Sequence, residues 1–224
     1  MRGHFITVEG IDGCGKSTFV KALAAALRRG GHDVVVTREP TGTWLGDAVR
    51  RSWDERSGPY IEALLFMADR SAHCEGISKE LDKGRIVISD RYLDSTLAYQ
   101  GSALARTFPG GLEGAMAWLR RASPPDVIVP DVTFFLKLEP ATSMKRMAGR
   151  PSRSKFERLA YLRRVHAAYL ELTKEKRFVT LDSMMPTEKL VSQAIDALKR
   201  MGASGKSTEK LSAHSASRTN ASGR

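Results

Sequence analysis

A glycine-rich segment near the start of the chain has the residue types and spacing of a phosphate-binding loop. The segment is Gly10-Ile11-Asp12-Gly13-Cys14-Gly15-Lys16-Ser17-Thr18, which fits the pattern G-x-x-x-x-G-K-S. Its glycines allow several backbone N–H groups to point inward at phosphate oxygens, beside the N-terminus of a helix. Lys16 can reach the β- and γ-phosphates of a nucleotide, and the Ser17 hydroxyl is a natural ligand for Mg²⁺. These residues predict a site for a nucleotide that carries a phosphate chain.

The flanks of this loop strengthen the prediction. An apolar run over residues 5–8 predicts a buried strand, and apolar residues recur at helical spacing over residues 19–29. Strand, loop and helix in this order are the context in which such a motif binds phosphate, rather than merely connecting two elements. The partial copy Gly205-Lys206-Ser207-Thr208 lacks this context, because Arg200 replaces its first glycine and no strand pattern precedes it.

Two arginines follow predicted strands and could serve a second phosphate. Arg38 follows the apolar run 34–37, and Arg91 follows residues 85–89 together with Asp90. Parallel strands end at one edge of a sheet, where open α/β sheets place their ligands, so both side chains should point to one place. Because guanidinium groups bind phosphate bidentately, the pair predicts an acceptor phosphate beside the loop. The alternative is ion pairing at the surface, for example between Arg91 and Asp90.

The densest basic stretch of the chain lies further on, opposed only by Glu157. It comprises Lys145, Arg146, Arg150, Arg153, Lys155, Arg158, Arg163 and Arg164. We expect residues 146–157 to form a lid whose Arg150 and Arg153 close over the phosphates, because Gly13 leaves the loop itself without an arginine. The alternative is a solvated basic helix end.

Phe66 and Arg70 lie four residues apart in a predicted helix and therefore share one face of it. Phe66 could stack on a base while Arg70 donates to a base carbonyl. The spacing alone favours the alternative, in which Phe66 belongs to the core and Arg70 lies at the surface.

The remaining pattern predicts an α/β fold of five strands, mostly parallel, with helices on both faces of the sheet. The expected strands cover residues 5–8, 34–37, 85–89, 132–136 and 178–181. The expected helices cover residues 19–29, 44–52, 59–81, 95–105, 112–121, 140–148 and 155–174. A last helix, with Thr187 as its N-cap, is expected to run to about Met201.

The composition suits one soluble domain over residues 1–201, followed by a Ser-, Gly- and Ala-rich tail, 202–224, that we expect to be disordered. No apolar run could span a bilayer, and no signal peptide precedes the first strand. The two cysteines, Cys14 and Cys74, favour a reducing cytoplasm over a disulfide. The net charge of +11 suits binding of nucleotide phosphates better than binding of a nucleic acid. The basic residues are concentrated in one stretch, and no predicted strand combines aromatic and basic residues in the way that stacks single-stranded bases.

Further motifs follow the loop in a fixed order. They are Thr37-Arg38-Glu39-Pro40, Phe66-Met67-Ala68-Asp69-Arg70, Asp90-Arg91-Tyr92 with Ser95-Thr96, Ala98-Tyr99-Gln100-Gly101 and Pro130-Asp131-Val132-Thr133. The ordered set, from residue 5 to about residue 200, resembles the thymidylate kinase family of P-loop nucleoside monophosphate kinases. The resemblance implies the P-loop NTPase fold, a homodimer, and Mg²⁺-dependent transfer of the γ-phosphate of ATP to dTMP, giving dTDP and ADP.

The resemblance also implies roles for individual residues. ATP would be bound by the loop, residues 10–18, and by Arg146. The acceptor would contact Asp12, Arg38, Phe66, Arg70, Arg91, Ser95, Thr96, Tyr99 and Gln100. Within this set Phe66 would stack on thymine, Arg70 and Thr96 would bond its edge, and Tyr99 would disfavour a 2′-hydroxyl. The catalytic residues would be Lys16, Asp12, Arg91, Arg150 and Arg153, and the Mg²⁺ ligands Ser17, Asp90 and Glu157.

Two alternatives stay open at this stage. The first is a kinase for another nucleoside monophosphate or for a deoxynucleoside, which differs in its acceptor. The second is a nucleotide-dependent DNA-binding protein that uses the basic surface and the tail. A GTPase is excluded, because no Asn-Lys-x-Asp segment of the kind that reads guanine follows a strand.

Overall fold

The computed structural model describes residues 2–148 and 155–202, and the side chains of the second range from Arg158 onward. At its centre is a sheet of five parallel strands in the order β2-β3-β1-β4-β5. The strands are β1 (Phe5–Glu9), β2 (Val34–Arg38), β3 (Ile86–Asp90), β4 (Val132–Lys137) and β5 (Phe178–Asp182). The α/β architecture predicted from the sequence is confirmed.

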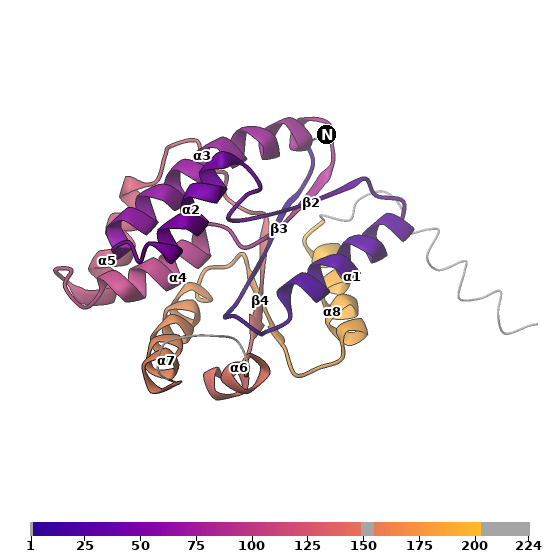
Figure 1. Cartoon of the computed structure of the whole chain (residues 1–224). Coiled ribbons are helices and arrows are strands. Elements are labelled where there is room, and N and C mark those ends of the chain that lie inside the picture. Colours follow the sequence, from indigo (N-terminus) through magenta and orange to yellow (C-terminus); the bar gives the residue numbers. More distant parts are fainter. Residues whose placement is uncertain (1, 149–154, 203–224) are drawn as a thin grey trace, which may run out of the picture.

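Helices cover both faces of this sheet (Figure 1). They are α1 (Lys16–Arg29), α2 (Trp44–Asp54), α3 (Pro59–Asp82), α4 (Leu93–Leu104), α5 (Gly111–Ala122), α6 (Pro140–Arg146), α7 (Lys155–Leu172) and α8 (Thr187–Arg200). α1 and α8 pack against each other on one face, while α4 on the opposite face contacts α3, α5 and α7. The carboxyl ends of β1, β2 and β3 thus open between two helical layers.

The central strand β1 is buried along its whole length. Ile6 and Val8 lie in the larger apolar cluster together with Phe19 and Leu23 of α1. Phe5 lies in a smaller cluster with residues of α3. Successive side chains of a strand point to opposite faces, so β1 is fixed from both sides. The loop that follows it therefore starts from a rigid position.

The start of α1 and the N-cap of α8 differ from the sequence predictions. α1 begins at Lys16 instead of residue 19, so Lys16 and Ser17 belong to its first turn. The prediction that Thr187 is the N-cap of α8 is wrong. Pro186 occupies that position, and its carbonyl accepts hydrogen bonds from the amides of Lys189 and Leu190. Among the helices described, none is long and apolar enough to cross a membrane.

Candidate active site

The loop between β1 and α1 has a backbone that favours glycine at three places. Gly10, Gly13 and Gly15 have φ angles of 144°, 76° and 91°, a region that other residues rarely adopt. A Cβ atom on Gly10 would also lie 2.7 Å from the carbonyl oxygen of Leu136 in the neighbouring strand β4. The loop leads directly into the N-terminus of α1, where unpaired amides favour an anion.

Lys16 is buried, and its ammonium folds back over this loop. Its Nζ donates to the carbonyl oxygens of Gly10 (3.0 Å) and Ile11 (3.1 Å). Burial, and after it the neighbouring Arg91 guanidinium, lowers the pKa of Lys16. A phosphate beside these two cations would oppose both effects, because it supplies negative charge where positive charge is crowded.

Ser17 and Asp90 bring two oxygen ligands together at the carboxyl edge. The Ser17 hydroxyl donates to Asp90 Oδ2 over 2.6 Å, which joins the first turn of α1 to the end of β3. A hydroxyl and a carboxylate are the hard oxygen donors that Mg²⁺ prefers, and Mg²⁺ usually takes only one or two protein ligands beside phosphate oxygens. This donor pair fits a magnesium ion that is held mainly by the nucleotide.

Arg91 lies where the loop, β3 and α4 meet. Its φ of 74° is unusual for a residue with a side chain, and its amide donates to the Val8 carbonyl over 3.0 Å. The guanidinium donates to Asp12 Oδ1 over 2.5 Å and to Ser95 Oγ over 2.9 Å. It also lies over the Tyr99 ring, 5.0 Å from the ring centre. The strained backbone therefore directs the guanidinium from β3 back toward the loop.

Asp12 remains ionised in this setting. Burial acts to raise the pKa of its carboxyl, but the charges of Arg91, Lys16 and Arg158 together hold that pKa below its ordinary value. Arg158 belongs to α7 and its guanidinium contacts the Met147 sulfur over 3.2 Å. Arg158 was included in the basic stretch of the sequence without being assigned a role. In the structure its positive charge acts on Asp12.

Two cavities, each of about 420 Å³, meet at Asp12 and Arg91. The first follows the loop and is called the phosphate cavity. It is lined by Asp12, Gly13, Gly15, Lys16, Ser17, Thr18, Arg38, Glu39, Asp90, Arg91, Arg146 and Met147. The second is called the acceptor cavity. It is lined by Asp12, Pro40, Trp53, Glu62, Phe66, Arg91, Ser95, Tyr99, Gln100 and Tyr161.

Both predicted strand-end arginines therefore reach one place. Arg38 is exposed and lines the phosphate cavity together with Arg91. Arg91 pairs with Asp12, so the alternative partner Asp90 is wrong for this side chain. Arg146 contacts the loop directly: it donates to the carbonyl of Gly13 over 3.3 Å and to Ser183 Oγ over 3.3 Å.

The acceptor cavity has aromatic walls that the sequence predicted only in part. Phe66 and Tyr99 were among the predicted contacts, whereas Trp53 and Tyr161 were not. The Trp53 and Phe66 ring centres lie 6.3 Å apart, and the Tyr161 hydroxyl donates to the Tyr99 carbonyl over 2.8 Å. Trp53 is an exposed aromatic residue at the end of α2, a feature that could have drawn attention to it. Glu62 completes this wall through a bond from Gln100.

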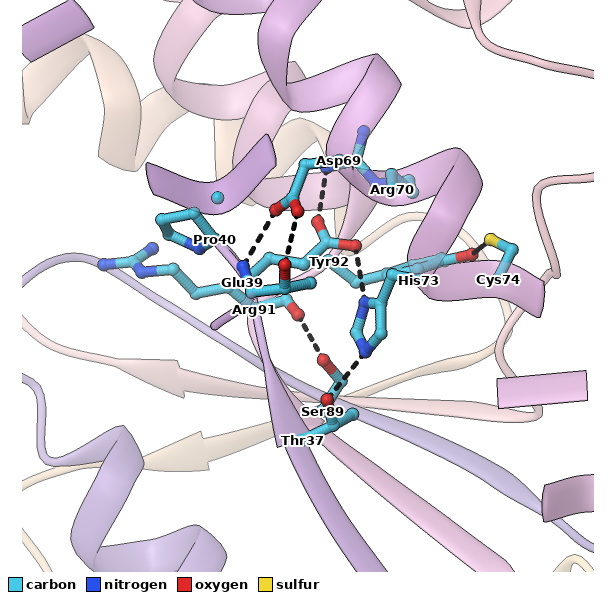
Figure 2. A network of polar contacts seen from close by, with 12 residues as sticks. Thr37, Glu39, Pro40, Asp69, Arg70, His73, Cys74, Ser89, Arg91 and Tyr92 are labelled. Atoms are coloured by element: carbon cyan, nitrogen blue, oxygen red, sulfur yellow. Dashed lines mark hydrogen bonds and ion pairs between the residues drawn. The ribbon is translucent and has the colours of Figure 1, made fainter. Parts of the chain in front are cut away.

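Arg70 is fully buried, so the prediction that it lies at the surface is wrong. One of its nitrogens, NH2, donates to Glu39 Oε2 (2.7 Å) and to Thr96 Oγ1 (2.8 Å). Its Nε and NH1 have no hydrogen-bond partner among the residues described. Arg70 and Thr96 are not among the described residues that line either cavity. Figure 2 shows Arg70 beside Glu39 at the end of β2.

The predicted lid is only partly covered by the structure. Arg150 and Arg153 lie outside the described residues, and so does the side chain of Glu157, whose backbone belongs to the first turn of α7. Met147 and Arg146, at the start of the predicted lid, line the phosphate cavity.

Comparison with known proteins agrees with this geometry. The family model described as "Thymidylate kinase" matches residues 8–195. The chain belongs to the thymidylate kinase family. A "Probable thymidylate kinase" of Methanoculleus marisnigri is 43% identical over 83% of this chain and 89% of its own length. Another from Methanospirillum hungatei is 40% identical over 87% and 93%, and a "Thymidylate kinase" of Halothermothrix orenii is 37% identical over 85% and 93%.

Membership of the thymidylate kinase family makes the chain a nucleoside monophosphate kinase. It also confirms the fold class, because the five parallel strands and the loop after β1 form the P-loop architecture of that family.

Proposed function

We propose that the protein transfers the γ-phosphate of ATP to dTMP in a Mg²⁺-dependent reaction, giving dTDP and ADP. The observation that carries this proposal is the meeting of two cavities at Asp12 and Arg91. One cavity has the amides and cations that a triphosphate requires, and the other has aromatic walls of the size of a nucleoside. Phosphoryl transfer depends chiefly on placing donor and acceptor phosphates in line, and this junction is where they would meet.

The donor side rests on the loop. Backbone amides and Lys16 would bind the β- and γ-phosphates, and Arg146 would lie toward the nucleoside of ATP. Ser17 and Asp90 would hold Mg²⁺, which when bound neutralises charge on the phosphate chain. Arg150, Arg153 and Glu157 stay proposals that the sequence alone supports.

The acceptor side rests on α3, α4 and the ends of β2 and β3. Arg38 and Arg91 would bind the phosphate of dTMP, and Asp12 would meet the sugar 3′-hydroxyl. Phe66 would stack on thymine, with Tyr99 against the deoxyribose. The other proposed contacts are Ser95, Gln100, Arg70 and Thr96, of which Arg70 carries two buried donors that could meet a base carbonyl.

An acceptor panel tests the proposal. ADP release from ATP and Mg²⁺ would be measured with dTMP, dUMP, UMP, CMP, AMP and thymidine at equal concentrations. We expect dTMP to give the highest kcat/KM and thymidine to give none, because the arginines require a phosphate. Preference for a purine monophosphate, or for thymidine itself, would refute dTMP as the acceptor.

We further propose a homodimer in the cytoplasm. Both cysteines are free and buried, which suits a reducing compartment. Ile61 and Leu64 lie on one side of α3 and are more than half exposed, at 52% and 55%, which suits burial against a second copy. Light scattering on the full chain and on Leu64→Glu tests this, with a dimer expected for the first and a monomer for the second.

A further inference from the structure

His73 joins the edge strand β2 to the buried carboxylate of Glu39. Its Nε2 lies 2.7 Å from Thr37 Oγ1, and its Nδ1 lies 3.0 Å from Glu39 Oε1. The side chain of His73 is only 8% exposed and that of Glu39 only 1%. Figure 2 shows this chain of contacts running from β2 through the imidazole to the end of the strand. Because both ring nitrogens are engaged, the orientation of the imidazole is fixed.

The second oxygen of Glu39 holds Arg70. Oε1 of the carboxylate faces His73, while Oε2 accepts from Arg70 NH2 over 2.7 Å. Arg70 therefore meets Glu39 through a single nitrogen. Its Nε and NH1 have no hydrogen-bond partner in the described part of the chain, although the guanidinium lies over the Tyr92 ring, 5.3 Å from the ring centre. An arginine and a carboxylate ordinarily prefer two parallel bonds. Something must keep Glu39 from turning both of its oxygens toward Arg70.

We propose that His73 is a positioning residue for recognition of the acceptor base. By donating from Nδ1 to Oε1, it occupies one oxygen of Glu39 and stops that carboxylate from chelating Arg70. Nε and NH1 of Arg70 then stay buried without a hydrogen-bond partner among the described residues, and we assign a carbonyl oxygen of the base as their acceptor. This inference rests on the proposed function, since it assumes that Arg70 reads the acceptor.

A neighbouring contact supports the same role for this turn of α3. Asp69 accepts from the amide of Thr41 (2.8 Å) and from its hydroxyl (2.5 Å). Asp69 and His73 lie one helical turn apart and hold residues on either side of Pro40, which lines the acceptor cavity. α3 thus fixes the segment from Glu39 to Thr41 from both sides, and His73 is the contact that also reaches Arg70.

The inference makes a prediction about base choice. A carbonyl at position 4 of the pyrimidine accepts from arginine, whereas an amino group at that position does not. dTMP and 5-methyl-dCMP differ at this group and at the neighbouring N3, which is a donor in thymine and an acceptor in 5-methylcytosine. If His73 keeps two Arg70 donors free, its loss should reduce the preference for dTMP over 5-methyl-dCMP, and not only the overall rate.

The experiment measures kcat and KM for dTMP, 5-methyl-dCMP and ATP in four variants. His73→Leu removes both contacts, His73→Asn keeps a donor near the position of Nδ1, and Thr37→Val removes the Thr37 contact alone. His166→Leu is the matched control, because His166 is a second mostly buried histidine, on α7, outside both cavities.

We expect His73→Leu to raise the KM for dTMP and to lower the dTMP preference, each about tenfold, with the KM for ATP changed less than about twofold. His73→Asn should restore the preference to within about threefold, and Thr37→Val should give an intermediate loss. An unchanged preference in His73→Leu, or an equal loss in His166→Leu or His73→Asn, would overturn the inference. If His73→Leu does not fold, an unchanged preference in Thr37→Val overturns it.

This outcome is separable from failure of the proposed function. If the wild-type protein does not phosphorylate dTMP, the proposed function is wrong. If the wild type phosphorylates dTMP and the His73 variants keep its preference, only the role of His73 is wrong.

Discussion

At the scale of single residues, Lys16 shows how burial prepares a cation for a phosphate. Its ammonium is held by two loop carbonyls next to Arg91, in a site that burial and like charge make unfavourable for it. Charge that develops on a transferred phosphoryl group would be stabilised strongly there, since the donor is already in place. We expect Lys16→Ala to lower kcat by about 10²–10³-fold.

The matched control for that variant lies in the same chain. Lys206 stands in the partial copy Gly205-Lys206-Ser207-Thr208. Lys206→Ala should leave kcat unchanged, and circular dichroism should show both variants folded. A Lys16→Ala protein with nearly normal turnover would contradict the role given to the loop.

Glu9 is a second residue whose surroundings make a prediction, in this case for stability. Burial, and then the nearby Asp94, raises the pKa of Glu9 from 4.5 to about 7. Between these two pH values the folded state binds more protons than the unfolded state, so Glu9 makes the protein less stable as pH rises through this window. The shift corresponds to about 3 kcal/mol.

Glu9→Gln should therefore change how stability depends on pH. The free energy of unfolding of the variant minus that of the wild type should increase from pH 4.5 to pH 7 by up to about 3 kcal/mol. Urea denaturation at half-unit steps of pH measures this difference. Glu188→Gln, on the surface of α8, should give a flat difference, and parallel curves for Glu9→Gln would contradict the prediction.

At the scale of elements, α2 contributes a wall to the acceptor cavity through its last turn. Trp53 is 46% exposed and stands opposite Phe66 of α3. A base that stacks on Phe66 would also change the surroundings of the Trp53 indole. In a Trp44→Phe, Trp118→Phe background, where Trp53 is the remaining tryptophan of the three in the chain, dTMP should change the emission saturably.

A companion substitution measures what this wall contributes. Trp53→Leu should weaken dTMP binding by about 0.5–1.5 kcal/mol, the range found for aromatic pairs, and leave ATP binding unchanged. Isothermal titration checks both affinities. Inorganic phosphate should not alter Trp53 emission. If inorganic phosphate changed the emission as much as dTMP does, the change could not be attributed to the base.

At the scale of the whole molecule, we expect the kinase machinery to lie within residues 1–201. Both cavities are lined by residues between Asp12 and Tyr161, and α8 ends at Arg200. The segment 203–224 has Leu211 as its only large apolar residue, which is too little to extend a core. A chain that ends at residue 202 should keep its kcat/KM for dTMP within about twofold and its unfolding midpoint.

The same truncation bears on the DNA-binding alternative. If the basic tail bound duplex DNA, the full chain would show salt-dependent affinity that the truncated chain loses. We expect neither chain to bind duplex DNA measurably at 150 mM salt. Loss of kinase activity on truncation would show that the tail belongs to the working enzyme.

The sequence predicted the parts of this protein that local patterns determine. The strand, loop and helix around Lys16 are continuous in the chain, and the family was recognisable from ordered motifs. Trp53 and Tyr161 were missed because they meet the acceptor cavity only through packing of α2 and α7. Arg70 could not be placed from spacing, since its burial depends on Glu39, which lies 31 residues earlier. Pro186 was missed as the N-cap of α8 because it has no side-chain oxygen, and its carbonyl accepts the bonds of the first turn instead.

The ion pair between Asp12 and Arg91 has a consequence for competition among anions. Arg91 already pairs with the Asp12 carboxylate, so an incoming phosphate must displace that carboxylate to bind the guanidinium. Free sulfate or orthophosphate gains little from that exchange, because it has no ring to place against the aromatic walls. For a nucleotide, contacts between its base and the aromatic walls offset the loss of this ion pair. Millimolar inorganic anions should therefore bind weakly at this junction and should not compete with a nucleotide present at low concentration.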